Sequence, residues 1–260
     1  MAQTESGVAG PPSLDWGCPW LRPWAGPGAP AWRQWATGGS VVQALAATQP
    51  TGSPVRFVSH DVLSAGAGYE RFIAGSGSVP TRDNLHDFFN GLAWLLFPQA
   101  KARLNRVHAE AETRPKAESG RGPARDAATL FDENGALLAA PDVLWQALAA
   151  RDWPALFVTH RACWAEARLL LFGHALLEKL ASPRKAITAH VLRLPLAAKD
   201  LDTPDAADGW LATRLDASLL ASKPFLPLPV LGVPGWWAAN EDRSFYDDAR
   251  VFRRPATPAG

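Results

Sequence analysis

The sequence predicts an α+β fold of mainly α class, with a helical core, a small β-sheet or hairpin, and ordered arms rich in Pro and Trp. Apolar residues recur at helical spacing over residues 85–96. Two short segments have the alternation that is typical of strands. Twelve tryptophans in 260 residues provide bulky groups that can fix irregular arms to a core. A chain of this length can bury a large core.

The N-terminal region is irregular in composition. Residues 1–12 are predicted to be a disordered tip, and residues 13–260 a single domain. Residues 13–39 are rich in Pro, Gly and Trp, and we expect their indoles to pin this arm to the domain. Three helices and one strand are expected before residue 75: helices Ala31–Ala36, Val41–Ala47 and Tyr69–Ala74, and strand Val55–Val58.

The strongest helical signal follows in PTRDNLHDFFNGLAWLLFP. Thr81 or Asp83 can cap its N-terminus, and Pro98 ends it. A second helix is expected over Gln99–Glu112, with its charges outward. Residues 113–125 are polar and rich in Gly and Pro, which predicts a loop that is mobile.

The second half is predicted to mix strands and helices. RDAATLFDENGALLAA predicts a β-hairpin, because Asn-Gly at Asn134-Gly135 is the favoured two-residue turn. Residues 160–181 are predicted to form the longest helix, and a Pro-rich tail from Pro224 is expected to pack down through its aromatic residues. The other expected elements are helix Pro141–Ala150, strand Ile187–Leu194 and helix Asp205–Leu220.

Composition excludes several classes of protein. The 26 Lys and Arg residues balance 25 Asp and Glu residues, so no nucleic-acid partner is expected. Two distant cysteines make neither a disulfide framework nor a thiolate zinc site. The apolar runs are too short to span a membrane, and no signal peptide precedes them, so a cytoplasmic location is expected.

Polar residues in apolar surroundings are the candidates for chemistry. His174 and Glu178 are four residues apart, so they would share a helical face and could offer two ligands to one divalent metal ion. We predict that His86 and His190 join them, and that Asp87 or Glu133 supports the metal or acts as general base. Such a site predicts a metal-assisted hydrolase acting on a small polar or phosphorylated substrate.

A structural interpretation of the same residues stays open. His174 and Glu178 can form one hydrogen-bonded pair that ties a central helix to its neighbours, because a buried polar group needs a partner. His86 would then only support its own helix.

A small-molecule ligand is the expected partner, and a second group of residues suggests how an anionic one would be held. A helix beginning near Arg82 offers free N–H groups, and the predicted mobile loop could close over a phosphate or carboxylate. The candidate substrate-binding residues are Arg82, Asn90, Arg103 and Arg125. The alternative function is a non-catalytic binding module that uses the Trp-rich arm and the basic loop, with an unknown protein or a ligand as partner.

Three motifs carry a resemblance to a known family: PTRDNLHDFFNGLAWLLFPQAKARLN, RDAATLFDENG and FGHALLEKL. The chain resembles a family, mostly from proteobacteria, known only as domain of unknown function three-zero-two-five. The resemblance extends from about residue 14 to the segment VFRRP. It implies one soluble domain in a bacterial cytoplasm, and it implies no activity, cofactor or catalytic residue.

Overall fold

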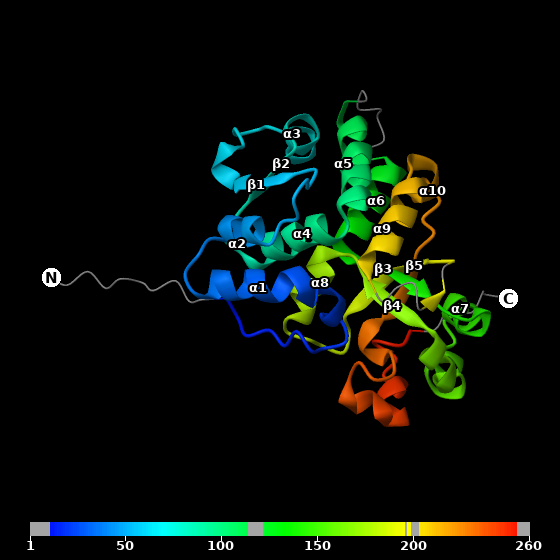
Figure 1. Cartoon of the computed structure of the whole chain (residues 1–260). Coiled ribbons are helices and arrows are strands. Elements are labelled where there is room, and N and C mark those ends of the chain that lie inside the picture. The colour runs from blue at the N-terminus through cyan, green and yellow to red at the C-terminus, as the bar shows by residue number, and fades with distance from the viewer. Residues whose placement is uncertain (1–10, 114–121, 196, 199–202, 254–260) are drawn as a thin grey trace.

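The computed structural model describes residues 11–113, 122–195, 197–198 and 203–253. The predicted N-terminal tip and most of the predicted mobile loop therefore lie outside the described residues. The described chain is mainly helical and carries two small sheets, which confirms the predicted fold class. In Figure 1, helices α1 (Ala25–Ala36) and α2 (Val41–Ala47) lie beside α4 (Leu85–Leu96), and the larger sheet lies on the other side of α8 (His174–Leu180).

The Trp-rich arm packs into the core, as its composition predicts. Trp24 is completely buried, and its ring lies 5.5 Å from that of Phe97. Trp32 packs edge-on against Phe88 of α4, with ring centroids 5.1 Å apart. These contacts make the arm part of the hydrophobic core, because buried indoles contribute large apolar areas.

Two parallel strands form the smaller sheet, β1 (Arg56–Ser59) and β2 (Ser78–Thr81), with Ser59 in register with Thr81. Helix α3 (Tyr69–Ser76) connects them, ending at Gly77, whose φ of 62° is the left-handed conformation that glycine tolerates best. Sequence analysis missed β2, because Thr81 was assigned to the start of the next helix. Asn84 caps that helix, not Thr81 or Asp83: its side chain accepts a hydrogen bond from the N–H of Asp87.

The larger sheet has the strand order β4–β3–β5–β6. β3 is buried along its whole length and pairs antiparallel with β4 and parallel with β5. β6 was not predicted, because its sequence LPLP contains prolines, which are confined to edge strands such as this one. The four strands are β3 (Gly135–Ala139), β4 (Arg168–Leu171), β5 (Thr188–Arg193) and β6 (Leu226–Pro229).

The remaining described helices surround these two sheets. The predicted helix Asp205–Leu220 is two helices, because Asp216 accepts a hydrogen bond from the N–H of Leu219 and so starts a second one. The α-helices are α5 (Pro98–Thr113), α6 (Pro123–Asn134), α7 (Asp142–Ala149), α9 (Pro204–Arg214) and α10 (Ala217–Ala221). Short 3₁₀ or π turns lie at Arg22–Trp24, His60–Val62, Ala155–Thr159, Arg161–Glu166, Val230–Gly232, Ala238–Glu241 and Arg243–Asp247.

The predicted hairpin is wrong in its first half. Residues 125–134 belong to α6, which ends at Asn134, and β3 begins at Gly135. Ala127 and Phe131 are four residues apart and buried on one face, which is helical spacing. Gly135 is required for close packing: a Cβ atom there would lie 2.3 Å from the carbonyl oxygen of Phe131.

The predicted long helix over residues 160–181 is also wrong. The chain forms a 3₁₀ turn, then the edge strand β4, and only then α8. The uniformly apolar stretch Leu169–Phe172 indicated a buried segment, but periodicity alone does not distinguish a buried strand from a buried helix. Gly173 separates β4 from α8 and is the N-cap residue of the helix.

Candidate metal centre

Two imidazoles from different helices face each other in the structure. His86 lies in the first turn of α4, and His174 is the first residue of α8. Their Nε2 atoms are 3.1 Å apart. Glu133, at the end of α6, places Oε1 3.6 Å from Nε2 of His174. One ligand atom from each of these three residues lies within 4.8 Å of the other two.

Two of the three separations fit a metal centre. Two ligand atoms bonded to zinc at ~2.0–2.1 Å in a tetrahedral arrangement are separated by about 3.3 Å. The separations of 3.1 Å and 3.6 Å lie on either side of that value. A hydrogen bond between two neutral imidazoles would also explain the first separation. The carboxylate of Glu133 beside His174 completes a two-His, one-carboxylate donor set.

Gly173 allows this convergence. A Cβ atom at residue 173 would lie 2.5 Å from the carbonyl oxygen of Glu133 and 2.6 Å from the backbone nitrogen of Asn134. The end of α6 and the start of α8 therefore approach more closely than a larger residue would permit. This approach brings His174 beside Glu133.

His174 lies beside a buried charged network. Its Nδ1 lies 3.7 Å from Oδ2 of Asp132, whose other oxygen is 2.5 Å from the ammonium group of Lys101. Burial lowers the pKa of His174 to about 3, and the cation of Lys101 opposes protonation further, although the carboxylate of Asp132 favours it. His174 is therefore neutral near pH 7, the state in which an imidazole binds a metal ion.

The network continues away from the imidazole. Lys101 also donates to Oδ1 of Asn90 at 2.9 Å, and Asn90 donates to the hydroxyl oxygen of Tyr69 at 3.1 Å. Burial raises the pKa of Asp132, but the effects that lower it, led by the cation of Lys101, outweigh burial and leave that pKa lowered, so Asp132 is ionised. Burial raises the pKa of Tyr69, which stays a neutral phenol.

A second carboxylate supports His86. Oε2 of Glu178 lies 2.9 Å from Nδ1 of His86. If Nδ1 carries the proton and donates it to this carboxylate, Nε2 keeps its lone pair and faces His174. Metal-binding histidines commonly pair in this way with an outer carboxylate, which fixes the tautomer and orients the ring. Each imidazole thus has a carboxylate near the nitrogen that faces away from the shared centre.

The three candidate ligands line one pocket of about 400 Å³. Burial raises the pKa of Glu133, although the nearby histidine and lysines lower it. The pocket is bounded by the ends of β1 and β2, by α3 and α4, by the C-terminal end of α6 and by the start of α8. Its lining residues are His60, Leu63, Tyr69, Glu70, Arg82, His86, Asp87, Asn90, Asp132, Glu133 and His174.

Six of the ten predicted site residues line this pocket, namely Arg82, His86, Asp87, Asn90, Glu133 and His174. The predicted roles of Glu133 and Glu178 are reversed in the structure. Glu133, predicted as a catalytic residue, lies at ligand distance, whereas Glu178, predicted as a ligand, lies behind His86. Glu178 pairs with His86 and not with His174, its predicted partner on the same helix.

Besides Glu178, three other predicted residues do not line the pocket. His190 lies on β5, opposite Gly135 of β3, and falls outside the three-residue group. Arg103 faces away from the pocket and donates from Nε to the carbonyl oxygen of Leu215 at 2.6 Å. Arg125 lies in the first turn of α6, at the opposite end from Glu133. The basic loop that was expected to bring in further cations lies largely outside the described residues.

Sequence analysis missed several residues of the pocket, including His60, Tyr69 and Asp132. Asp132 was assigned to a hairpin turn, and the helical spacing of Ala127 and Phe131 was the signal that could have corrected it. His60 carries no local signal of a site, because the parallel pairing of β1 with β2, which places it beside Arg82, depends on residues distant in sequence.

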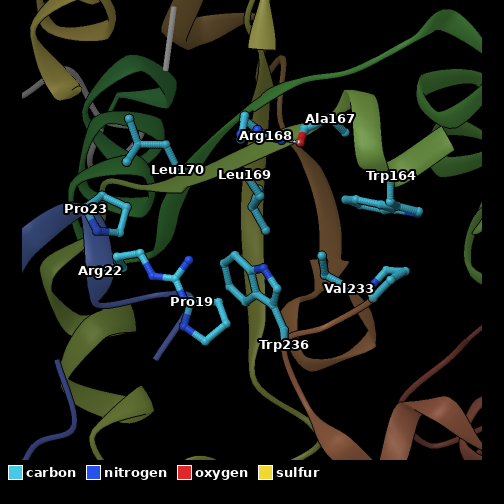
Figure 2. Close-up of a pocket in the computed structure, with 11 residues that line it drawn as sticks. Pro19, Arg22, Pro23, Trp164, Ala167, Arg168, Leu169, Leu170, Val233 and Trp236 are labelled. Carbon is cyan, nitrogen blue, oxygen red and sulfur yellow. Dashed lines mark hydrogen bonds between the residues drawn. The ribbon is translucent and has the colours of Figure 1, made fainter. Parts of the chain in front are cut away.

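A second pocket, of about 430 Å³, lies on another part of the molecule (Figure 2). Its lining combines aromatic and apolar side chains, Trp164 and Trp236 among them, with two arginines. These are Arg168 and Arg22, and Arg22 extends toward the pocket from the N-terminal arm. Its described lining contains no carboxylate, imidazole or thiol. The groups suited to acid–base or metal chemistry are therefore in the first pocket.

In the part of the chain that the structure describes, no helix has both the length and the apolar character needed to cross a bilayer. No curated protein and no solved structure shows significant similarity to the chain. The model of one family, described as a protein of unknown function (DUF3025), matches residues 55–256, which is most of the sequence and includes the whole candidate metal centre. The chain therefore belongs to the DUF3025 family.

Proposed function

We propose that this protein is a metal-dependent hydrolase of a small polar or phosphorylated substrate, with His86, His174 and Glu133 as the metal ligands. The observation that supports the proposal most directly is the meeting of two Nε2 atoms 3.1 Å apart with a carboxylate oxygen 3.6 Å from one of them. Nδ1 of His86 also has a carboxylate at hydrogen-bond distance, as metal-binding histidines usually do, and the carboxylate of Asp132 lies 3.7 Å from Nδ1 of His174.

The other residues of the pocket take the remaining roles. A divalent metal ion with an open position lowers the pKa of bound water and so supplies a nucleophile near neutral pH. Asp87 is the proposed general base. One of its oxygens accepts the backbone N–H of Arg82 at 2.6 Å, and its second oxygen has no hydrogen-bond partner among the described residues. Asn90 and Arg82 line the same pocket and are the proposed substrate contacts.

Metal content tests the proposal first. Protein purified without chelators should carry close to one equivalent of a divalent metal by elemental analysis, and His86→Ala and His174→Ala should each lose it. His190→Ala is the matched control, since this histidine lies outside the group and its variant should keep the metal. Less than a tenth of an equivalent in the unaltered protein, even after incubation with Zn²⁺ or Mn²⁺, would refute the proposal.

Activity tests it second. Metal-loaded protein should hydrolyse members of a panel of p-nitrophenyl phosphates and carboxylic esters, and Asp87→Asn should lower kcat while keeping the metal bound. Retention of full activity by Asp87→Asn would remove Asp87 as the base. The proposal also includes a cytoplasmic location, which cell fractionation would test.

A non-catalytic binding function is the second candidate, and the pocket in Figure 2 is the observation that favours it. The Trp-rich arm supplies Pro19, Arg22 and Pro23 to that pocket, opposite Trp236. Deleting residues 1–39 would not test this function cleanly, because it removes the completely buried Trp24. Trp236→Ala is the better variant: it should abolish binding of a ligand held in this pocket without affecting metal content.

A further inference from the structure

The small parallel sheet brings two basic side chains to the rim of the candidate metal pocket. Ser59 and Thr81 are paired at the carboxyl ends of β1 and β2. His60 directly follows β1 and Arg82 directly follows β2, so both residues lie at the same edge of the sheet. In sheets of parallel strands, ligands commonly bind beyond the carboxyl ends.

These two side chains contact each other. Nη2 of Arg82 lies 2.6 Å from Nε2 of His60, and both residues line the pocket. A guanidinium group has five N–H donors and no acceptor, so this contact makes Nε2 of His60 the acceptor and uses one donor of Arg82. Nδ1 of His60 is buried and has no hydrogen-bond partner in the described part of the chain.

Arg82 lacks the partner that a guanidinium group usually has. Among the described residues, no carboxylate lies within ion-pair distance of its side chain. The neighbouring Asp87 is not a substitute, because it accepts the backbone N–H of Arg82. The guanidinium group, with four donors left, is thus held at the mouth of the pocket by an imidazole and not by an anion.

We propose that Arg82, oriented by His60, is a subsite for an oxyanion, a phosphate or carboxylate group carried by the substrate. A planar guanidinium group binds such groups through two parallel hydrogen bonds, which gives both affinity and orientation. This inference rests on the proposed function, because the bound anion is part of a substrate only if the metal centre in the same pocket carries out the reaction. It narrows the proposed substrate class from small polar or phosphorylated molecules to molecules that carry an anionic oxygen group.

Anion binding to the whole protein, measured by titration calorimetry with and without Zn²⁺, tests the subsite. Inorganic phosphate and acetate are the two probes, and the tighter binder identifies the class of oxyanion. We expect Arg82→Met to weaken binding of that probe at least tenfold, because it removes charged hydrogen bonds. His60→Gln should weaken it less, since an amide can still accept from Arg82.

Arg56→Met is the matched control. Arg56 is exposed at the opposite end of β1, so its loss removes the same charge from the same sheet without touching the pocket. Its affinity for the probe should equal that of the unaltered protein. Equal affinities of the Arg82 and Arg56 variants, or no binding of either probe, would overturn the subsite.

The two proposals fail in different ways. Anion binding that requires Zn²⁺ and is unchanged in Arg82→Met would mean that the anion binds the metal alone: the subsite would be refuted and the metal centre retained. Anion binding that Arg82→Met abolishes, in a protein that takes up no metal, would support the subsite and refute the proposed hydrolase.

Discussion

The buried pair of Lys101 and Asp132 offers the sharpest test of how the site is built. The side chains of Lys101 and Asp132 are 5% and 15% exposed, and Nζ lies 2.5 Å from Oδ1. At that distance the attraction is ~7 kcal/mol for an effective dielectric constant of about 20. Desolvation of the two ions costs several kcal/mol each, so the pair as a whole adds little to stability. Removal of one partner leaves the other charge buried and uncompensated.

The perturbation is therefore a double-mutant cycle with Lys101→Met and Asp132→Leu, which replace the charges with apolar side chains of similar size. Each single variant should lose ~3–5 kcal/mol in the free energy of unfolding, and the double variant should lose less than either one. Lys101→Met carries the larger loss, because it also leaves Oδ1 of Asn90 without its donor. Losses of this size are measurable within the ~5–15 kcal/mol of a typical domain.

Urea unfolding of the metal-free protein measures the cycle, provided that the slope with denaturant stays unchanged. Additive losses, with a coupling energy under ~0.5 kcal/mol, would refute this reasoning. Additivity would mean that the two charges are solvated well enough not to depend on each other. Asp132 would then also be unable to influence His174 through a low-dielectric interior.

Three further predictions concern the ligands, the core and pH. Glu178→Gln should weaken metal affinity ~10–100-fold, because it removes the carboxylate that orients the ligand His86. Glu133→Gln should weaken the affinity more, because it removes a ligand. If metal titrations give the reverse order, Glu178 is the ligand. Gly91→Ala should cost ~1–3 kcal/mol in denaturant unfolding, because its Cβ would lie 2.1 Å from Cδ1 of Leu45. The control Gly209→Ala, with no described atom within 4 Å, should be neutral or stabilising. Burial lowers the pKa of His174 in the folded protein to about 3, from the usual histidine value of 6.5. Below pH 6.5 the imidazole is therefore protonated in the unfolded chain but not in the folded one. Stability of the metal-free protein should therefore fall from pH 6.5 to 5, at up to ~1.4 kcal/mol per pH unit, and His174→Gln should flatten that slope.

Sequence reasoning succeeded where local signals determine the structure. The helix Leu85–Leu96 has a capping residue, an apolar face and a proline directly after its end, all of which act within a few residues. The helix predicted over Val41–Ala47 has those bounds in the structure. Such elements do not depend on a distant part of the chain for their identity.

Predictions from the sequence failed where tertiary contacts determine which of two possible local structures forms. Residues 125–135 end in Asn-Gly, which is compatible with a hairpin and with a helix that ends at a glycine. The structure forms a helix there, because α6 packs against α5 and α10 and buries Ala128 and Phe131. β2 and β6 were missed for a related reason, since each depends on a partner strand that is distant in sequence.

The reversed roles of Glu133 and Glu178 have the same cause: the sequence does not show which helices pack together. Spacing along one helix groups residues that share a face, so it grouped His174 with Glu178. Because α4 packs against α8, the face that carries Glu178 meets His86, and Glu178 pairs with that imidazole instead. Glu133 reaches His174 because Gly173 lets the end of α6 approach the start of α8. A sequence therefore indicates which polar groups share a helical face, whereas helix packing determines which of them touch a common centre and which lie behind it.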